Sequence, residues 1–216
     1  MIRRLLFGLL LLVVVALLAF DLVVTSVANH DLASRAKTST GATAASASLS
    51  PFPVVYRALA EGEVSRVHLR LSGVPAGPLR IHAVTLALSK VDLSRRQLVV
   101  NRRVDVTSIG RAVVTADVTS ADLSHATGQQ VRVLSNGQVD VDVAGIVVAV
   151  TPRLEGDSWL DVEVDGFSVL YVNLSTIPLM SDCSFSLHAT QGQLQLSCTM
   201  SPVPSSVVNA LAAPAG

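Results

Sequence analysis

Apolar residues follow two different patterns along this chain. Residues 5–20 form an apolar stretch without a charge, and Asp21 is the first charged residue after it. Further on, apolar and polar residues alternate, as Val67, Leu69 and Leu71 do with the residues between them. A continuous apolar stretch is typical of a helix in apolar surroundings, and alternation is typical of a half-buried strand. The sequence therefore predicts one apolar helix followed by a β-rich domain.

Two interpretations of residues 1–28 remain open, a membrane anchor and a cleaved signal peptide. Arg3 and Arg4 precede the apolar stretch, which favours a cytoplasmic N-terminus. An anchor needs about 20 mostly apolar residues, a length that is reached if Asp21 lies near the outer interface. A signal peptide needs a small-x-small cleavage site, and the residues up to Ala28 provide one. Either way, we expect an extracytoplasmic domain, held by a single membrane pass or secreted after cleavage near Ala28.

Residues 29–48 are predicted to continue the helix and then to form a linker or a first strand. The segment Thr38–Ser50 is rich in Ala, Ser and Thr, which is typical of flexible linkers. It also alternates weakly, with Ala45, Ala47 and Leu49 on one side. The composition and the alternation thus support different interpretations, and both stay open.

Residues 49–216 read as one mainly β domain with a few short helices. A short helix is predicted over Val54–Glu61, and a helix capped by Ser120 is predicted to end near Thr127. Turn signals separate the predicted strands at the spacing of sandwiches and barrels. Strands are predicted around residues 66–71, 79–88, 97–107, 111–119, 131–134, 138–143, 146–152, 158–164, 169–174, 184–189 and 193–199, with turns at 73–78, 135–137 and 191–192.

Cys183 and Cys198 are the two cysteines of the chain. An even number of cysteines in an exported domain indicates a disulfide. A hairpin that turns at Gln191-Gly192 places the two residues opposite each other within about one register step. Two free buried thiols are the alternative that the sequence leaves open.

Charge and motif content exclude several classes of function. The chain carries 16 basic and 16 acidic residues, so it lacks the basic surface that nucleic-acid binding requires. It shows no nucleophile elbow, phosphate-binding loop or zinc-protease motif, so we expect no catalytic residue, no metal site and no cofactor. Aromatic residues make up 4% of the chain. Smooth aliphatic inner faces suit a groove for an apolar ligand, and they equally suit an ordinary core.

The order of short motifs resembles the actinobacterial cell-envelope lipid-binding proteins of the lipomannan elongation factor (LmeA-like) family. The resemblance covers roughly Leu49 to Val208. It rests on Ser50-Pro51-Phe52-Pro53, Leu59-Ala60-Glu61-Gly62-Glu63-Val64, Val118-Thr119-Ser120-Ala121-Asp122-Leu123, the Asn-Gly hairpin and the close at Pro202–Pro204. Pro51 and Phe52 match the family's Pro-Phe element, whereas the Ala/Ser-rich segment before it is less bulky than in the family.

The resemblance implies an exported protein that binds phospholipid, with phosphatidylinositol-type lipid as the candidate ligand, and that supports envelope lipid or lipoglycan assembly. It also implies an elongated, curved antiparallel sheet or half-barrel wrapped around a helix, as in tubular lipid-binding domains. The implied partners are the membrane and envelope biosynthesis proteins.

Within this scheme, alternation suggests where a lipid would bind. We expect Phe52, Val55 and Leu59 to form a lid or a membrane-contacting tip. Val67, Leu69 and Leu71 are the candidates for the groove wall. A closed β-sandwich that serves as a structural or adhesion module with protein partners explains the same alternation. A cavity of several hundred Å³ between the inner faces would distinguish the two.

Overall fold

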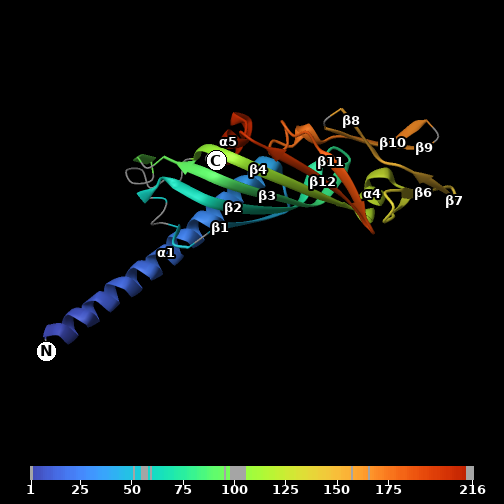
Figure 1. The fold of residues 1–216 in the computed structure, drawn as a ribbon. Coiled ribbons are helices and arrows are strands. Elements are labelled where there is room, and N and C mark those ends of the chain that lie inside the picture. Colours follow the sequence, from blue (N-terminus) through green and yellow to red (C-terminus); the bar gives the residue numbers. More distant parts are fainter. Residues whose placement is uncertain are drawn as a thin grey trace.

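The computed structural model describes residues 2–50, 52–54, 58, 60–94, 96–97, 106–156, 158–164 and 166–212. It begins with a 39-residue helix, α1 (Ile2–Thr40), which is about 58 Å long at the usual rise per residue. Nearly all of the remaining regular structure is antiparallel β-sheet, which confirms the predicted mainly β fold. Figure 1 shows an elongated molecule in which α1 projects beyond one end of the sheet.

Six strands form the large sheet, in the order β1-β2-β3-β4-β12-β11. Neighbouring strands are antiparallel throughout. β1 and β11 are the two edges, so the sheet does not close into a barrel. The strands are β1 (Ala44–Ser50), β2 (Glu63–Ala76), β3 (Leu79–Leu93), β4 (Val106–Thr119), β11 (Ser186–Thr190) and β12 (Gln193–Met200).

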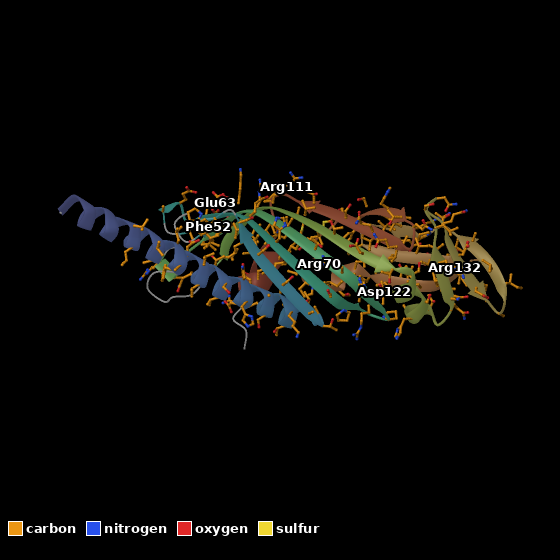
Figure 2. All side chains as sticks on the ribbon, turned by 90° about the horizontal axis from the view of Figure 1, so that it is seen from below. Phe52, Glu63, Arg70, Arg111, Asp122 and Arg132 are labelled. Atoms are coloured by element: carbon orange, nitrogen blue, oxygen red, sulfur yellow. A yellow bond between two sulfur atoms is a disulfide. The ribbon has the colours of Figure 1, made fainter. Side chains whose placement is uncertain are left out.

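Two three-stranded sheets lie at the end of the molecule opposite to the projecting part of α1 (Figure 1). One has the order β5-β6-β7 and the other the order β10-β9-β8. Figure 2 shows Asp122 and Arg132 at this end, and Phe52 and Glu63 near the end from which α1 projects. The remaining elements are α4 (Ser120–Thr127), β5 (Gln130–Val133), β6 (Val139–Val143), β7 (Ile146–Val150), β8 (Arg153–Glu155), β9 (Trp159–Val164), β10 (Phe167–Asn173), the 3-10 helix η1 (Leu174–Thr176) and α5 (Ser205–Ala212).

The C-terminal half of α1 packs against the large sheet and α5. Leu32, Ala36 and Thr40 are buried, and their i, i+4 spacing places them on one face of the helix. The helix contacts β1, β2 and α5 through this part of its length. On the sheet, Val67, Leu69 and other alternating aliphatic residues face the same core. The core is therefore shared between one helix face and one sheet face.

The structure resolves the alternatives for residues 38–50 in favour of a strand. α1 continues to Thr40, Gly41 follows with a φ of 67°, and β1 starts at Ala44. β1 pairs with β2 along its whole length, so Leu49 lies opposite Val67. Weak alternation was thus the better guide than the linker-like composition, because strand pairing stabilises a segment of low intrinsic preference.

Several predicted boundaries were wrong. The turn expected at residues 73–78 is shorter than predicted. β2 continues to Ala76 and β3 begins at Leu79, so the turn comprises Gly77 and Pro78. Gly73 is accommodated within β2 at a φ of 63°, a conformation that glycine adopts without strain. The strand expected at residues 111–119 is present as part of β4, which begins at Val106 and runs unbroken through Gly110. The strand expected at residues 97–107 was wrong at its start, because Gln97 is helical. Residues 98–105 lie outside the described part.

The cap of α4 is Thr119 rather than the expected Ser120. The Thr119 hydroxyl accepts a hydrogen bond from Asp122 N at 3.2 Å, and Asp122 Oδ2 accepts one from Thr119 N at 2.9 Å. This is a capping box, in which two terminal N–H groups are satisfied reciprocally. The prediction was off by one residue because Ser120 is also a good cap by type.

The predicted disulfide between Cys183 and Cys198 is confirmed, with a Cα–Cα distance of 5.7 Å. Cys198 lies on β12, in the hairpin that turns at Gln191-Gly192 as expected. Cys183 lies three residues before the start of β11 at Ser186. Since Ser186 pairs with Ser197, the residue that would lie opposite Cys198 is Phe185 and not Cys183. The disulfide thus joins the segment that leads into the hairpin to the second strand, two steps away from direct opposition.

No helix within the described part of the chain is long and apolar enough to cross a membrane. The membrane helix expected within residues 1–28 is therefore not supported by the structure.

Candidate functional site: an apolar cavity between α1 and the large sheet

A cavity with a volume of about 1210 Å³ lies between α1 and the inner face of the large sheet. This exceeds the range of roughly 300–1,000 Å³ that is usual for small-molecule sites. Its lining comprises Phe20, Val23, Val24, Thr25, Ser26, Val27, Ala28, His30, Asp31, Leu32, Ser34 and Arg35 of α1, together with Leu49, Val54, Ala58, Val64, Val67, Leu69, Leu88, Val91, Leu93, Val106, Ile109 and Leu211.

The sheet side of the cavity is entirely aliphatic. Val67 of β2 pairs with Leu88 of β3, and both side chains line the cavity. Val91 of β3 pairs with Ile109 of β4, which extends the same wall across three strands. Because side chains alternate between the faces of a strand, the polar residues between them point away from the cavity. The described residues of this wall offer a ligand no hydrogen-bonding side chain.

Among the described residues, the polar side chains that line the cavity all belong to α1. These residues are Thr25, Ser26, His30, Asp31, Ser34 and Arg35. Ser26, His30 and Ser34 are exposed, so the cavity opens to solvent along this side of the helix. The cavity is therefore asymmetric, with aliphatic side chains on the sheet side and both apolar and polar side chains on the helix side.

Charge in the lining is concentrated in one ion pair. Arg35 Nη2 donates to Asp31 Oδ2 at 2.5 Å, across one helical turn. The Arg35 side chain is 12% exposed, and that of Asp31 is 41% exposed. The charges of this pair cancel within the described lining, and the pair places a guanidinium group at the edge of the apolar volume.

Asp21 connects α1 to the segment that follows β1. Its side chain is buried, and Oδ2 accepts a hydrogen bond from the backbone N of Val54 at 3.3 Å. Val54 and Ala58 line the cavity, so this bond holds one end of the cavity together. Within the helix predicted at 54–61, Val54, Ala58 and Ala60 are helical and Glu61 lies in a turn; residues 55–57 and 59 lie outside the described part.

The structure divides the predicted groove residues. Val67 and Leu69 line the cavity. Leu71 is fully buried in the core and is not among the residues that line the cavity. β2 extends past the cavity, so a position on the correct face can still lie beyond it.

Of the three predicted lid residues, Phe52 lies in the described part of the chain. Val55 and Leu59 lie outside the described residues. Phe52 is 51% exposed and does not line the cavity. It lies near the end of the sheet from which α1 projects, as Figure 2 shows. Its position suits a surface contact better than a closed lid.

Sequence analysis missed the contribution of α1 altogether. Residues 20–28 were assigned to a membrane anchor or a signal peptide, but most of them line the cavity. A usable signal was present, because Asp21, Thr25 and Asn29 recur at intervals of four residues. Such spacing gives the helix one polar stripe, whereas a membrane-spanning helix is hydrophobic all round.

Within the described part of the chain, no group of three or more His, Cys, Asp or Glu residues is arranged to hold a metal ion. A second, smaller cavity of about 200 Å³ is lined by Thr151, Arg153, Asp161 and Glu163.

No family profile, no curated protein and no solved structure matches this chain. The resemblance to the LmeA-like family therefore stays a prediction.

Proposed function

We propose that the protein binds the acyl chains of a lipid in the cavity between α1 and the large sheet. The observation that carries this proposal is the aliphatic sheet wall facing a volume of about 1210 Å³. Each methylene group that leaves water for such a site contributes about 0.8 kcal/mol. Partial enclosure of one or two acyl chains thus gives tight binding without a catalytic group, so the proposed activity is binding and transfer rather than catalysis.

A closed β-sandwich with protein partners was the rival interpretation. The large sheet has two open edges, and the cavity is larger than the several hundred Å³ set as the discriminating volume. A structural module normally closes its core at the packing density of organic crystals. These features favour the lipid proposal over the rival.

The proposed ligand is a phospholipid, with the phosphatidylinositol type as the first candidate because of the family resemblance. His30 and Arg35 are the basic side chains in the described lining, and both belong to α1. A phosphate group at Arg35 would compete with Asp31 for the guanidinium. Headgroup charge is therefore expected to contribute less to affinity than the acyl chains do.

The proposed location is extracytoplasmic and next to a membrane, where the protein would support envelope lipid assembly. A disulfide persists in oxidising compartments, which supports the extracytoplasmic part. The projecting part of α1 exposes large apolar side chains, among them Leu12 and Phe20, which supports contact with a lipid surface. Because residues 20–28 form part of the cavity, we propose that α1 is retained rather than cleaved near Ala28.

The test is lipid analysis of the full chain, since truncation after α1 would remove one wall of the cavity. The purified protein is extracted for lipid and examined by native mass spectrometry, then offered phosphatidylinositol and phosphatidylcholine vesicles in parallel. We expect about one co-purified or acquired phospholipid per chain. A clean apo mass without uptake from either vesicle would overturn the proposal and favour the structural module.

A further inference from the structure

The formal net charge of zero conceals a strong separation of charge along the chain. Residues 1–128 contain 14 basic and 8 acidic residues, whereas residues 129–216 contain 2 basic and 8 acidic residues. Seven of the latter acidic residues fall within residues 140–165, the segment that contains β6, β7, β8 and β9. These strands lie at the end of the molecule opposite to the projecting part of α1 (Figure 1). Negative charge is therefore concentrated at one end, and the rest of the molecule carries the excess of positive charge.

Three arginines and a histidine gather on the outer face of the large sheet. Arg66, His68 and Arg70 of β2 are exposed and alternate with the residues that line the cavity, so they point away from it. Arg66 pairs with Ser89 of β3, and Ser89 pairs with the exposed Arg111 of β4. Arg66 and Arg111 therefore lie in one row, about 10 Å apart. We call these four residues the basic patch. It lies directly behind the sheet wall of the cavity.

The guanidinium groups of the basic patch are available to an anionic partner. Within the described part of the chain, no carboxylate lies within 4.0 Å of the side-chain nitrogen atoms of the three arginines. Small side chains occupy the outer positions beside them. These are Ser46, Ser48 and Ser50 of β1 and Thr85, Ala87 and Ser89 of β3. The long basic side chains thus stand above a smooth polar surface, which suits contact with a flat, negatively charged one.

Acidic residues lie beyond the basic patch in both directions along the strands. Glu63 pairs with Asp92 toward one end. Toward the other end, the Asp117 carboxylate accepts a hydrogen bond from Gln195 Nε2 at 3.0 Å. In Figure 2, Arg111 and Arg70 lie between Glu63 and Asp122 along the length of the molecule. The basic patch is therefore a bounded area in the part of the sheet that holds the cavity.

We propose that the basic patch docks the protein onto an anionic lipid bilayer, with the acidic end turned away from it. The proposal goes beyond the binding of acyl chains, because it assigns a role to the outer face of the sheet. A basic side chain close to an anionic leaflet strengthens binding about fivefold, within roughly one Debye length of the surface. The same surface repels residues 140–165, so the separation of charge also orients the bound molecule.

The acidic end of a second copy is the rival occupant of the basic patch. Such a contact joins different surfaces of two copies, so it repeats from copy to copy instead of closing into a dimer. The exposed apolar side chains of Leu12 and Val15 favour the bilayer, because they belong to the positively charged part of the chain. Apolar and electrostatic attraction to an anionic bilayer then act in the same part of the molecule.

The experiment measures co-sedimentation of the full chain with two kinds of vesicle. One is phosphatidylcholine alone, and the other is an equal mixture of phosphatidylcholine and phosphatidylglycerol. In about 0.1 M salt we expect wild type to partition into the anionic vesicles on the order of a hundredfold more strongly. In about 1 M salt the Debye length falls from about 10 Å to about 3 Å, and most of this preference should disappear.

Substitutions by glutamine assign the preference to the basic patch. Arg66→Gln, Arg70→Gln and Arg111→Gln should each weaken binding to anionic vesicles about fivefold, and the triple variant should lose most of the preference. Binding to phosphatidylcholine vesicles and the melting temperature should stay at the wild-type values. Arg132→Gln is the matched control, because Arg132 is an exposed strand residue opposite Asp140 at the acidic end (Figure 2). It removes the same charge and should leave the preference unchanged.

The remaining outcomes overturn the proposal. If wild type shows no salt-sensitive preference, or if Arg132→Gln weakens it as much as Arg66→Gln does, the basic patch is not a docking surface. If wild type associates without lipid and the triple variant does not, a second copy occupies the basic patch instead.

Native mass spectrometry of the protein recovered from the same vesicles keeps the two proposals apart. Acquired phosphatidylcholine without an anionic preference would support acyl-chain binding and refute docking. Docking without any acquired lipid would do the reverse.

Discussion

The carboxylate of Asp21 accepts a hydrogen bond from the backbone N of Val54 across 33 residues of sequence, at 3.3 Å. A charged residue in the middle of an apolar helix is thereby buried against the β-rich domain. The bond fixes the part of α1 that lines the cavity relative to the segment after β1. This contact makes α1 from Asp21 onward a structural part of the domain.

Asp21→Ala should therefore destabilise the fold. Hydrogen bonds to charged groups contribute about 1.5–3 kcal/mol, so we expect a loss of about that size in the free energy of unfolding. Asp21→Asn keeps an acceptor oxygen and should lose less. Urea denaturation measures both, and hydrogen exchange should show faster exchange in residues 21–35 of the alanine variant. Equal stability of Asp21→Ala and wild type would show that α1 does not depend on this bond.

Two substitutions on one strand should separate cavity filling from overpacking. Val67 lines the cavity, and Leu71 lies on the same face of β2 but outside it. Val67→Phe should reduce lipid uptake at least severalfold without lowering stability, because the ring occupies empty space. Leu71→Phe should cost about 1–3 kcal/mol by overpacking and leave lipid uptake intact. Native mass spectrometry and thermal unfolding of both variants give the comparison. If Leu71→Phe reduced lipid uptake and Val67→Phe did not, the ligand would bind elsewhere.

The disulfide should contribute substantially to stability. Cys183 and Cys198 are separated by 15 residues. A loop of that length loses enough entropy in the unfolded chain to account for about 3 kcal/mol. The double variant Cys183→Ala/Cys198→Ala should unfold at correspondingly lower urea concentration than oxidised wild type. Wild type under reducing conditions should approach the variant, and a lack of difference would mean that the hairpin needs no covalent link.

Gly73 should tolerate alanine far less well than Gly192, although both have a positive φ, of 63° and 86°. A Cβ at Gly73 would lie 2.5 Å from Thr43 Oγ1, whereas a Cβ at Gly192 would meet nothing within 4 Å. Gly192→Ala should thus lower the free energy of unfolding by about 1–2 kcal/mol, which is the cost of the left-handed conformation alone. Gly73→Ala should lower it clearly more.

Thr43→Ala provides the test of cause in this pair. Thr43 Oγ1 donates to Ser72 O at 2.8 Å, so the single substitution loses that bond, but it also makes room for a Cβ at Gly73. In a double-mutant cycle by urea denaturation, Thr43→Ala should partly rescue Gly73→Ala. If the losses in unfolding free energy of the two single variants simply add up in the double variant, the clash is relieved in another way.

Asp182 should make the stability depend on pH in acid. Its carboxylate accepts hydrogen bonds from Ser206 Oγ at 2.6 Å and Ser181 Oγ at 3.0 Å, and these lower its pKa below the ordinary 3.8. A lowered pKa in the folded state stabilises the fold above the ordinary pKa, and this contribution is lost as pH falls through the folded value.

Ser206→Ala removes the larger of the two causes. The pKa of Asp182 should rise toward its ordinary value, as measured by NMR titration of the carboxyl group. Wild type should be the more stable protein at neutral pH, and its advantage should shrink as the pH falls below the folded pKa. An unchanged pKa in Ser206→Ala would show that the hydroxyl does not determine the titration.

Local patterns in the sequence predicted many of the strands, because the alternation of side chains along a strand is a local property. The Asn136-Gly137 signal correctly placed the hairpin between β5 and β6, where Asn136 Oδ1 accepts from Gln138 N at 3.0 Å. The same reasoning failed at Gly73, where the glycine lies inside β2 instead of a turn. A glycine signals a special backbone conformation, but pairing with β1 and β3 decides whether the strand continues.

The sequence by itself determined a mainly β domain after a long apolar helix, and it determined the disulfide between Cys183 and Cys198. Only the tertiary structure decided that α1 forms a wall of the cavity. An apolar helix buries its surface equally well in hydrocarbon and against a sheet, so its own composition does not distinguish them. The choice depends on contacts between distant segments, from Phe20 to Leu211 around one cavity, which no local pattern records.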